Sequence, residues 1–168
     1  MRSTSRRLVS LLALASLQVL AASGLRAETP IAGAAPSAVP GASAYAGAVK
    51  VTPLLKTKVD AAGRPLVYPT DGPAEITAVL VEVPPGGRTG WHKHPMPCIG
   101  YILEGELRVT LIDGRVNVFR AGEAIAETVN LEHEGVNSGP GPARLVMFVL
   151  GTEGRAFTVK MPGPATVE

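Results

Sequence analysis

The sequence predicts an all-β protein built as one antiparallel sandwich or barrel. Short runs of β-branched and other apolar residues recur between residues 51 and 160, and none of them shows a convincing helical period. Turn-forming pairs such as Asp71-Gly72, Asp113-Gly114 and Ala121-Gly122 separate the runs. Many short strands at this spacing are typical of an antiparallel sandwich or barrel.

The expected strands lie between these turns. Residues 76–83 are nearly all apolar and β-branched, which is typical of a buried strand. Residues 107–111 alternate between apolar and polar side chains, as expected for a strand with one face in the core. Asp113-Gly114 is expected to form a two-residue hairpin turn before the next strand. The other predicted strands are 51–59, 99–103, 116–119, 124–129, 133–137, 144–150 and 156–160.

The first 48 residues are expected to lie outside the folded domain. Residues 1–27 are typical of a secretory signal peptide, because arginines precede an apolar run and small residues lead to Ala27. A membrane anchor is the alternative, but polar residues interrupt the run and it is short for a bilayer span. Residues 28–48, mostly Ala, Pro, Gly and Ser, are expected to be a flexible tether. The remaining residues, 49–168, suffice for one domain with a single core.

Removal of the signal peptide would reverse the sign of the net charge. The whole chain carries +2, but residues 1–27 hold four arginines and no acidic residue, which leaves 12 basic and 14 acidic residues. The sequence shows no interleaved basic and aromatic patch, so we expect no nucleic-acid partner. We expect a periplasmic or secreted protein without a stable membrane span after cleavage.

The three histidines of the chain fall in two short segments. His92 and His94 are at i and i+2, so on an extended strand both imidazoles project from one face. His133 lies far enough along the chain to return on another strand. Imidazole suits zinc, copper, iron and nickel, and three imidazoles leave coordination positions for water, substrate or oxygen. The sequence therefore predicts a metal site formed by these three residues.

The first histidine segment resembles the first motif of the cupin superfamily. Gly86, His92, His94, Cys98 and Gly105 have the spacing of that motif. The family usually has glutamate at the position of Cys98.

The second histidine segment resembles the second cupin motif. Gly114 is followed by Ala121-Gly122, and then by His133 and Asn137, while Arg120 stands at the usual proline position. The resemblance covers about residues 77–150 and is to the small single-domain cupins. It implies a β-barrel of jelly-roll type that holds one divalent metal ion, which could be iron, manganese, zinc, copper or nickel.

The resemblance implies two classes of function. One is an oxygen-dependent, dioxygenase-like oxidation of a small organic substrate at the metal. The alternative is a non-catalytic periplasmic module that binds or senses a small ligand or the metal itself. Small cupins often pair through their outer sheets, so a homodimer is also expected.

Cys98, the single cysteine, has three possible roles. It could be a small apolar filler, because cysteine is among the most buried residue types. Its thiolate could instead be a fourth metal ligand, which would favour softer metals. The cupin-like cysteine dioxygenases suggest a third role, in which a thiol lies near the iron without binding it.

Glu127 and Trp91 are the remaining candidates. On the predicted strand 124–129, an inward Glu127 could complete a site of three histidines and one carboxylate or act as a base toward substrate. An outward, solvated Glu127 is the alternative, since glutamates are mostly exposed. Trp91 precedes His92 and is expected to pack between sheets or against a partner, with a place at a substrate mouth as the alternative.

Overall fold

The computed structural model describes residues 40–41 and 47–165, and within them nine strands. The strands are β1 (Ala74–Val83), β2 (His92–Lys93), β3 (Cys98–Glu104), β4 (Glu106–Leu111), β5 (Val116–Arg120), β6 (Ala124–Ala126), β7 (His133–Val136), β8 (Ala143–Thr152) and β9 (Val159–Lys160). The predicted all-β class is confirmed.

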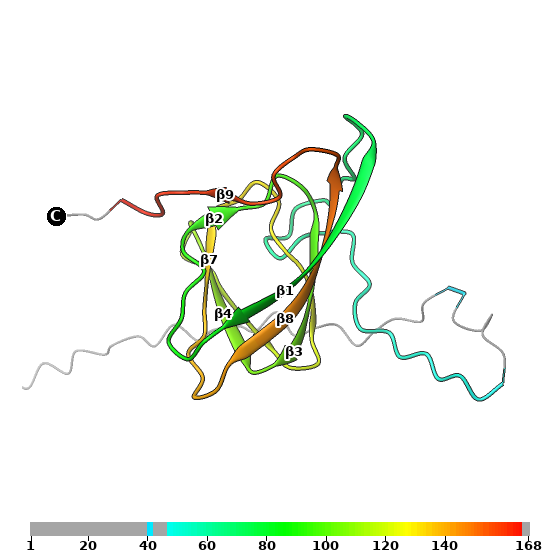
Figure 1. The fold of residues 1–168 in the computed structure, drawn as a ribbon, viewed down its shortest axis with the longest axis horizontal. Coiled ribbons are helices and arrows are strands. Elements are labelled where there is room, and N and C mark those ends of the chain that lie inside the picture. Colours follow the sequence, from blue (N-terminus) through cyan, green and yellow to red (C-terminus); the bar gives the residue numbers. More distant parts are fainter. Residues whose placement is uncertain (1–39, 42–46, 166–168) are drawn as a thin grey trace, which may run out of the picture.

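The strands form two antiparallel sheets that face each other across the interior (Figure 1). One sheet has the order β1-β8-β3-β6, and the other has the order β5-β4-β7-β2-β9. β1 and β8 pair along their whole length, from Ala74 opposite Thr152 to Val83 opposite Ala143. Apart from the β4–β5 hairpin, neighbouring strands in both sheets are not consecutive in sequence, so segments far apart in the chain meet inside the fold.

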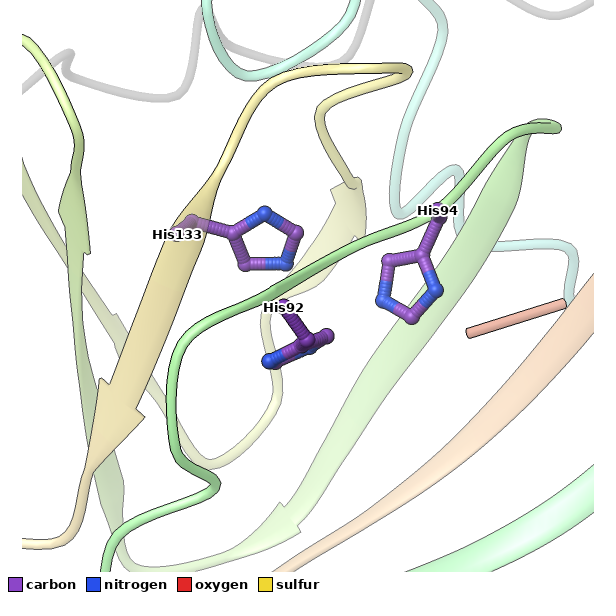
Figure 2. Close-up of side chains that lie close together, drawn as sticks. All are labelled: His92, His94 and His133. Atoms are coloured by element: carbon purple, nitrogen blue, oxygen red, sulfur yellow. The ribbon is translucent and has the colours of Figure 1, made fainter. Parts of the chain in front are cut away.

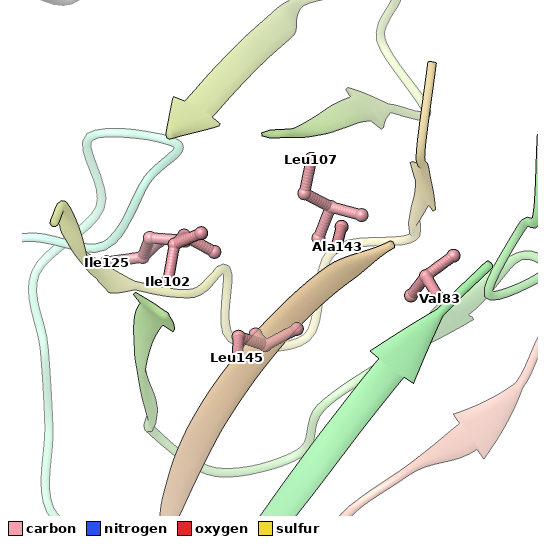
Figure 3. Packing of buried hydrophobic residues seen from close by; sticks show 6 residues of the cluster. All are labelled: Val83, Ile102, Leu107, Ile125, Ala143 and Leu145. Atoms are coloured by element: carbon pink, nitrogen blue, oxygen red, sulfur yellow. The ribbon is translucent and has the colours of Figure 1, made fainter. Parts of the chain in front are cut away.

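The core follows from the period of two along each strand. In β8, every second side chain from Ala143 to Val149 is buried, and in β4 Leu107 and Leu111 are buried. A cluster from both sheets fills one part of the interior (Figure 3): Val83, Ile102, Leu107, Ile125, Ala143 and Leu145. A second cluster of Met96, Cys98, Met147 and Val149 lies nearer the first histidine segment. Burial of these side chains supplies the main driving force for folding.

The hairpin between β4 and β5 differs in detail from the predicted two-residue turn. The amide of Gly114 donates to the carbonyl of Leu111, and the amide of Leu111 donates to the carbonyl of Arg115. Gly114 has φ +85°, so a turn ending in a left-handed glycine makes a three-residue loop with a bulge. The need for a positive φ at this glycine was predicted, and the extra loop residue was not.

Three strand predictions need correction. Residues 51–59 form no strand, because the segment has no neighbouring strand to pair with. Its apolar side chains, including Leu54, are exposed, and Val59 makes a single bridge to Pro65. The strand predicted over 124–129 ends at Ala126, after which the chain bends so that Val129 bridges to His94. The strand predicted over 156–160 is reduced to β9.

The N-terminal predictions fall largely on residues that the structure does not describe. The predicted signal peptide, residues 1–27, lies outside the described residues, and so does most of the predicted tether, 28–48. Within the described part of the chain, no helix is both long and apolar enough to cross a membrane.

Candidate metal centre

The fold brings the three histidines together on the inner face of the five-stranded sheet. His92 in β2 lies directly opposite His133 in β7, and His94 follows two residues after His92. Figure 2 shows the three imidazoles gathered around one point, with His92 and His94 on one segment and His133 on the facing strand. One ring nitrogen from each residue lies within 4.8 Å of the other two. The grouping predicted from the i, i+2 spacing is therefore present.

Each imidazole is oriented by a backbone carbonyl at its Nδ1 atom. The pairs are His92 with Gly90 at 2.8 Å, His94 with Phe157 at 2.8 Å, and His133 with Leu131 at 2.9 Å. A carbonyl only accepts, so each Nδ1 carries the hydrogen and each Nε2 keeps its lone pair. This is the tautomer that binds a metal through Nε2, with a backbone acceptor holding the ring behind it.

The Nε2 atoms of His94 and His133 are buried and have no hydrogen-bond partner. Among all described residues, the buried side-chain nitrogen and oxygen atoms without a hydrogen bond are these two. Their side chains are 3% and 4% exposed, so they are almost fully removed from bulk water. Buried polar atoms are nearly always satisfied, and two unpartnered imidazole nitrogens in one cluster fit a metal ion. The residues present therefore fit the metal that the sequence predicted.

Glu127 faces the histidines. Its Oε2 atom lies 3.1 Å from Nε2 of His94 and 3.5 Å from Nε2 of His133, although neither contact has the geometry of a hydrogen bond. The backbone fixes this position, because the amide of Glu127 donates to the carbonyl of Cys98 at 2.8 Å. Of the two orientations considered from the sequence, the structure has the inward one.

The contact between Glu127 and His94 shifts both pKa values. Burial lowers the pKa of His94, but its contacts with Cys98 and with Glu127 outweigh burial and raise it to about 10. Burial raises the pKa of Glu127, but His133 and His94 outweigh burial and lower it to about 2. His92 differs, because burial is its largest influence and its pKa is lowered. Without a metal ion, these contacts favour a second proton on Nε2 of His94 and a negative charge on Glu127, and a metal ion bound at Nε2 would replace that proton.

Cys98 lies beside this group and is not one of the three clustered nitrogen ligands. Its side chain is 1% exposed and packs with Met96, Met147 and Val149. The thiol lies 3.6 Å from the carbonyl of Met96. This is the environment expected of the apolar filler, and the contact with His94 also keeps the thiol within reach of the site.

A cavity of about 530 Å³ opens from the histidines into the space between the sheets. His92, His94, His133 and Glu127 line it, as does Trp91. The sequence favoured packing for Trp91 and left the mouth as the alternative. The structure places the indole at the cavity and also against the backbone of Gly163, where an added Cβ would come within 2.6 Å of its ring.

Several residues that hold the site were not found from the sequence. The carbonyl of Phe157 orients His94, and the hydroxyl of Thr128 lies 3.0 Å from Nδ1 of His133. Asp60 accepts from the backbone amide of Val129, the residue that bridges to His94. A backbone carbonyl has no signal in a sequence, whereas Asp60 begins the turn Asp-Ala-Ala-Gly and could have been identified as its cap.

Residues 79–149 match the family described as Cupin domain. This segment of the chain is a cupin domain. It is a small cupin, and its three histidines form the grouping that could hold a metal ion. The expected family is thereby confirmed, as is the two-sheet architecture that it implied.

The chain is also similar to parts of several solved structures. An oxalate oxidase shares 27% identity over 52% of this chain and 46% of its own, with a TM-score of 0.44. The oxalate decarboxylase of Lactobacillus farciminis shares 23% identity over 51% of this chain and 26% of its own, with a TM-score of 0.46. A double-stranded β-helix protein from Klebsiella pneumoniae shares 24% identity over 56% and 84%, with a TM-score of 0.45.

This chain therefore spans less than half the length of those two oxalate enzymes. No curated protein matches the chain.

Proposed function

We propose that this cupin binds one divalent metal ion through Nε2 of His92, His94 and His133 and uses it to oxidise a small organic substrate with oxygen. One observation carries the proposal. All three Nδ1 atoms are held by backbone carbonyls, so the three free Nε2 atoms meet at the end of a cavity large enough for a substrate. When bound, a redox-active metal would supply the open coordination positions and the electron transfer that this chemistry needs.

The protein side chains have separate tasks in this proposal. The carbonyl groups of Gly90, Phe157 and Leu131 keep the imidazoles in the metal-binding tautomer. Glu127, which is ionised at neutral pH and lines the cavity, accepts a proton from a substrate or serves as a fourth ligand. The barrel wall separates the site from bulk water, which strengthens electrostatic interactions there.

The alternative is a binding module without turnover. The same cavity and histidines would then hold a small ligand or the metal itself, which the depth and apolar lining of the cavity also permit. The two functions differ in what the metal does. A catalytic site needs a redox-active metal with an exchangeable position, whereas a binding module shows ligand affinity without oxygen uptake.

Nitric oxide, a spectroscopic substitute for oxygen, distinguishes the two. The Fe(II)-loaded protein is expected to bind nitric oxide and to give the electron paramagnetic resonance signal of an iron–nitrosyl complex. Oxygen uptake is then measured with a panel of small organic compounds for the wild type, Glu127→Gln and the control Glu123→Gln, whose side chain is on the exposed turn before β6. Uptake that is lost in Glu127→Gln and kept in Glu123→Gln supports an enzyme. A nitrosyl signal without uptake for any compound supports the binding module.

The remaining expectations are part of the same proposal. An exported protein would acquire its metal and small-molecule partner in the periplasm or outside the cell, and fusion of residues 1–27 to a reporter enzyme tests export.

A homodimer is supported by apolar side chains on the outer face of the four-stranded sheet, where Ile76 and Phe148 are 68% and 44% exposed. Analytical ultracentrifugation of the wild type and of Ile76→Lys tests the dimer.

A further inference from the structure

The wall of the cavity away from the histidines is almost entirely apolar. Inward positions of four strands contribute aliphatic and aromatic side chains from both core clusters: Val79, Val81, Val109, Phe119, Leu145 and Met147. Two inward positions are glycines. Gly135, a lining residue, lies opposite Val109, and Gly100 lies opposite Met147 and Ile125. The missing side chain at Gly135 lets Leu107 and Thr89 pack close to the backbone, since an added Cβ would come within 3.3 Å of both.

Two threonine hydroxyls of the lining are already engaged within the protein. The hydroxyl of Thr89 donates to the carbonyl of Gly90 and accepts from the amide of Gly135. The hydroxyl of Thr128 lies between the carbonyl of Leu131 and the His133 ring. A ligand with many hydroxyl groups would have to bury them without partners, which is unfavourable.

Charged groups are equally sparse. Apart from the histidines, the charged side chains among the described lining residues are Glu127 and Lys160. Lys160 is exposed and lies in β9 opposite His92, so it marks the rim at the metal end. A small dianion would place one charge at the metal and leave the other facing apolar walls or this single rim lysine.

We infer that the ligand of this site is a small organic molecule with an apolar body and one oxygen-bearing head group. The head group is held at the metal end, near Glu127 and Lys160, and the body occupies the part of the cavity lined by Val109, Phe119 and Leu145. The part of the inference that concerns the head group rests on the proposed function. The part that concerns the apolar body rests on the lining of the cavity.

The test is a series of alkyl hydroxamates, whose head group binds metals and whose tail is varied from acetohydroxamate to octanohydroxamate. Dissociation constants for the Zn(II)-loaded protein are measured by calorimetry. Each methylene moved from water into the cavity is expected to tighten binding by about three- to fourfold until the cavity is full. Binding of acetohydroxamate with no gain along the series would overturn the inference while leaving the metal site in place.

Two variants locate the tail. Val109→Phe adds an aromatic ring to the apolar part of the cavity lining and is expected to weaken octanohydroxamate by about tenfold or more, with acetohydroxamate nearly unchanged. Val118→Phe makes the same change on the outer face of β5, outside the cavity lining, and is expected to leave both unchanged. Circular dichroism checks folding, and Val81→Phe replaces Val109→Phe if the latter does not fold. Equal effects of the inward and outward variants would contradict the assigned position.

A second series does not depend on the metal. Binding of 1-butanol to 1-octanol to the metal-free protein should also strengthen by about three- to fourfold per methylene. If Zn(II) does not bind, the proposed function fails, and this series still decides the character of the cavity. An alcohol series without chain-length dependence would overturn the inference whatever the result with zinc.

Discussion

The β1–β8 ladder and the β2 segment are held in place by different interactions. β1 and β8 pair over ten residues without a register shift, and their alternate side chains enter the core. β2 is two residues long, and the chain that follows it is positioned by contacts from distant segments, such as the carbonyl of Phe157 and the bridge from Val129.

The difference teaches that stability and site geometry have separate origins in this protein. Backbone pairing and apolar burial over a long ladder supply most of the stability. A few polar contacts to the backbone set the positions of the ligands, as expected where a site needs accuracy in a short irregular segment. Changes in the core should thus alter unfolding more than metal binding.

The largest expected change in stability comes from the core of the four-stranded sheet. Ile102 is 1% exposed and lies in the main core cluster, outside the cavity lining, so Ile102→Ala should lower the free energy of unfolding by about 2–5 kcal/mol. The control is the next residue, Leu103, which is 47% exposed and should cost less than about 1 kcal/mol as Leu103→Ala. Urea unfolding measures both. A loss of zinc affinity in folded Ile102→Ala would show that core and site are not separate.

The next effect concerns Asp60, which links a surface turn to the site. Its carboxylate accepts from the amides of Ala62, Arg64 and Val129 and from the Arg64 guanidinium. In Asp60→Asn the amide nitrogen would face donors, so the free energy of unfolding at pH 7 should fall by about 1–3 kcal/mol. Asp113→Asn is the control, because Asp113 pairs with Arg115 on the exposed hairpin, where such pairs contribute about 1 kcal/mol or less.

The effect of Asp60 should depend on pH. Burial raises the pKa of Asp60, but the hydrogen bonds from Arg64, Val129 and Ala62 outweigh burial and lower the pKa below 3.8. A carboxyl whose pKa is lower in the folded state stabilises the fold above its unfolded pKa and loses this effect as pH falls through the folded value. The difference between wild type and Asp60→Asn should therefore be constant near neutrality and shrink below about pH 4. A difference that grows with acidity would contradict this.

A smaller effect is expected for Cys98→Ala. Removal of one sulfur from a packed apolar cluster should cost on the order of 1 kcal/mol and leave zinc affinity nearly unchanged. A metal-binding thiolate would instead give a large loss of affinity, greatest at high pH. An accessory thiol would keep the metal and lower turnover. Zinc titrations at two pH values, with oxygen uptake, separate the three roles.

The smallest effect is expected when the chain is shortened to begin at Lys50. The segment around residues 49–55 exposes its apolar side chains, among them Val49, Val51 and Leu54, and belongs to neither sheet. Thermal unfolding and zinc binding of the shortened chain should equal those of the longer one. A large drop in melting temperature would show that this segment docks as an added strand.

Local sequence patterns predicted the long strands and the three histidines, but not the long-range contacts that position the histidines. Alternation identified β4, strand-like runs between turn signals identified β1 and β8, and the i, i+2 spacing with the two motifs brought His92, His94 and His133 together. The inward direction of Glu127 follows from alternation with the buried Ile125. The strand expected over 51–59 failed because an apolar run shows β propensity whether or not a partner strand exists. The roles of the Phe157 carbonyl and Asp60 depend on contacts across more than sixty residues, which local patterns do not reveal.

The central claim is that three free Nε2 atoms form one metal site, and the metal content of single alanine variants tests it most directly. His92→Ala, His94→Ala and His133→Ala are purified with the wild type, and bound metal is measured by elemental analysis after removal of loosely bound ions. Each variant should lose most of its metal while circular dichroism shows an intact fold, because each removes one of few ligands and leaves the β1–β8 ladder untouched. Full metal retention in all three variants would contradict the account.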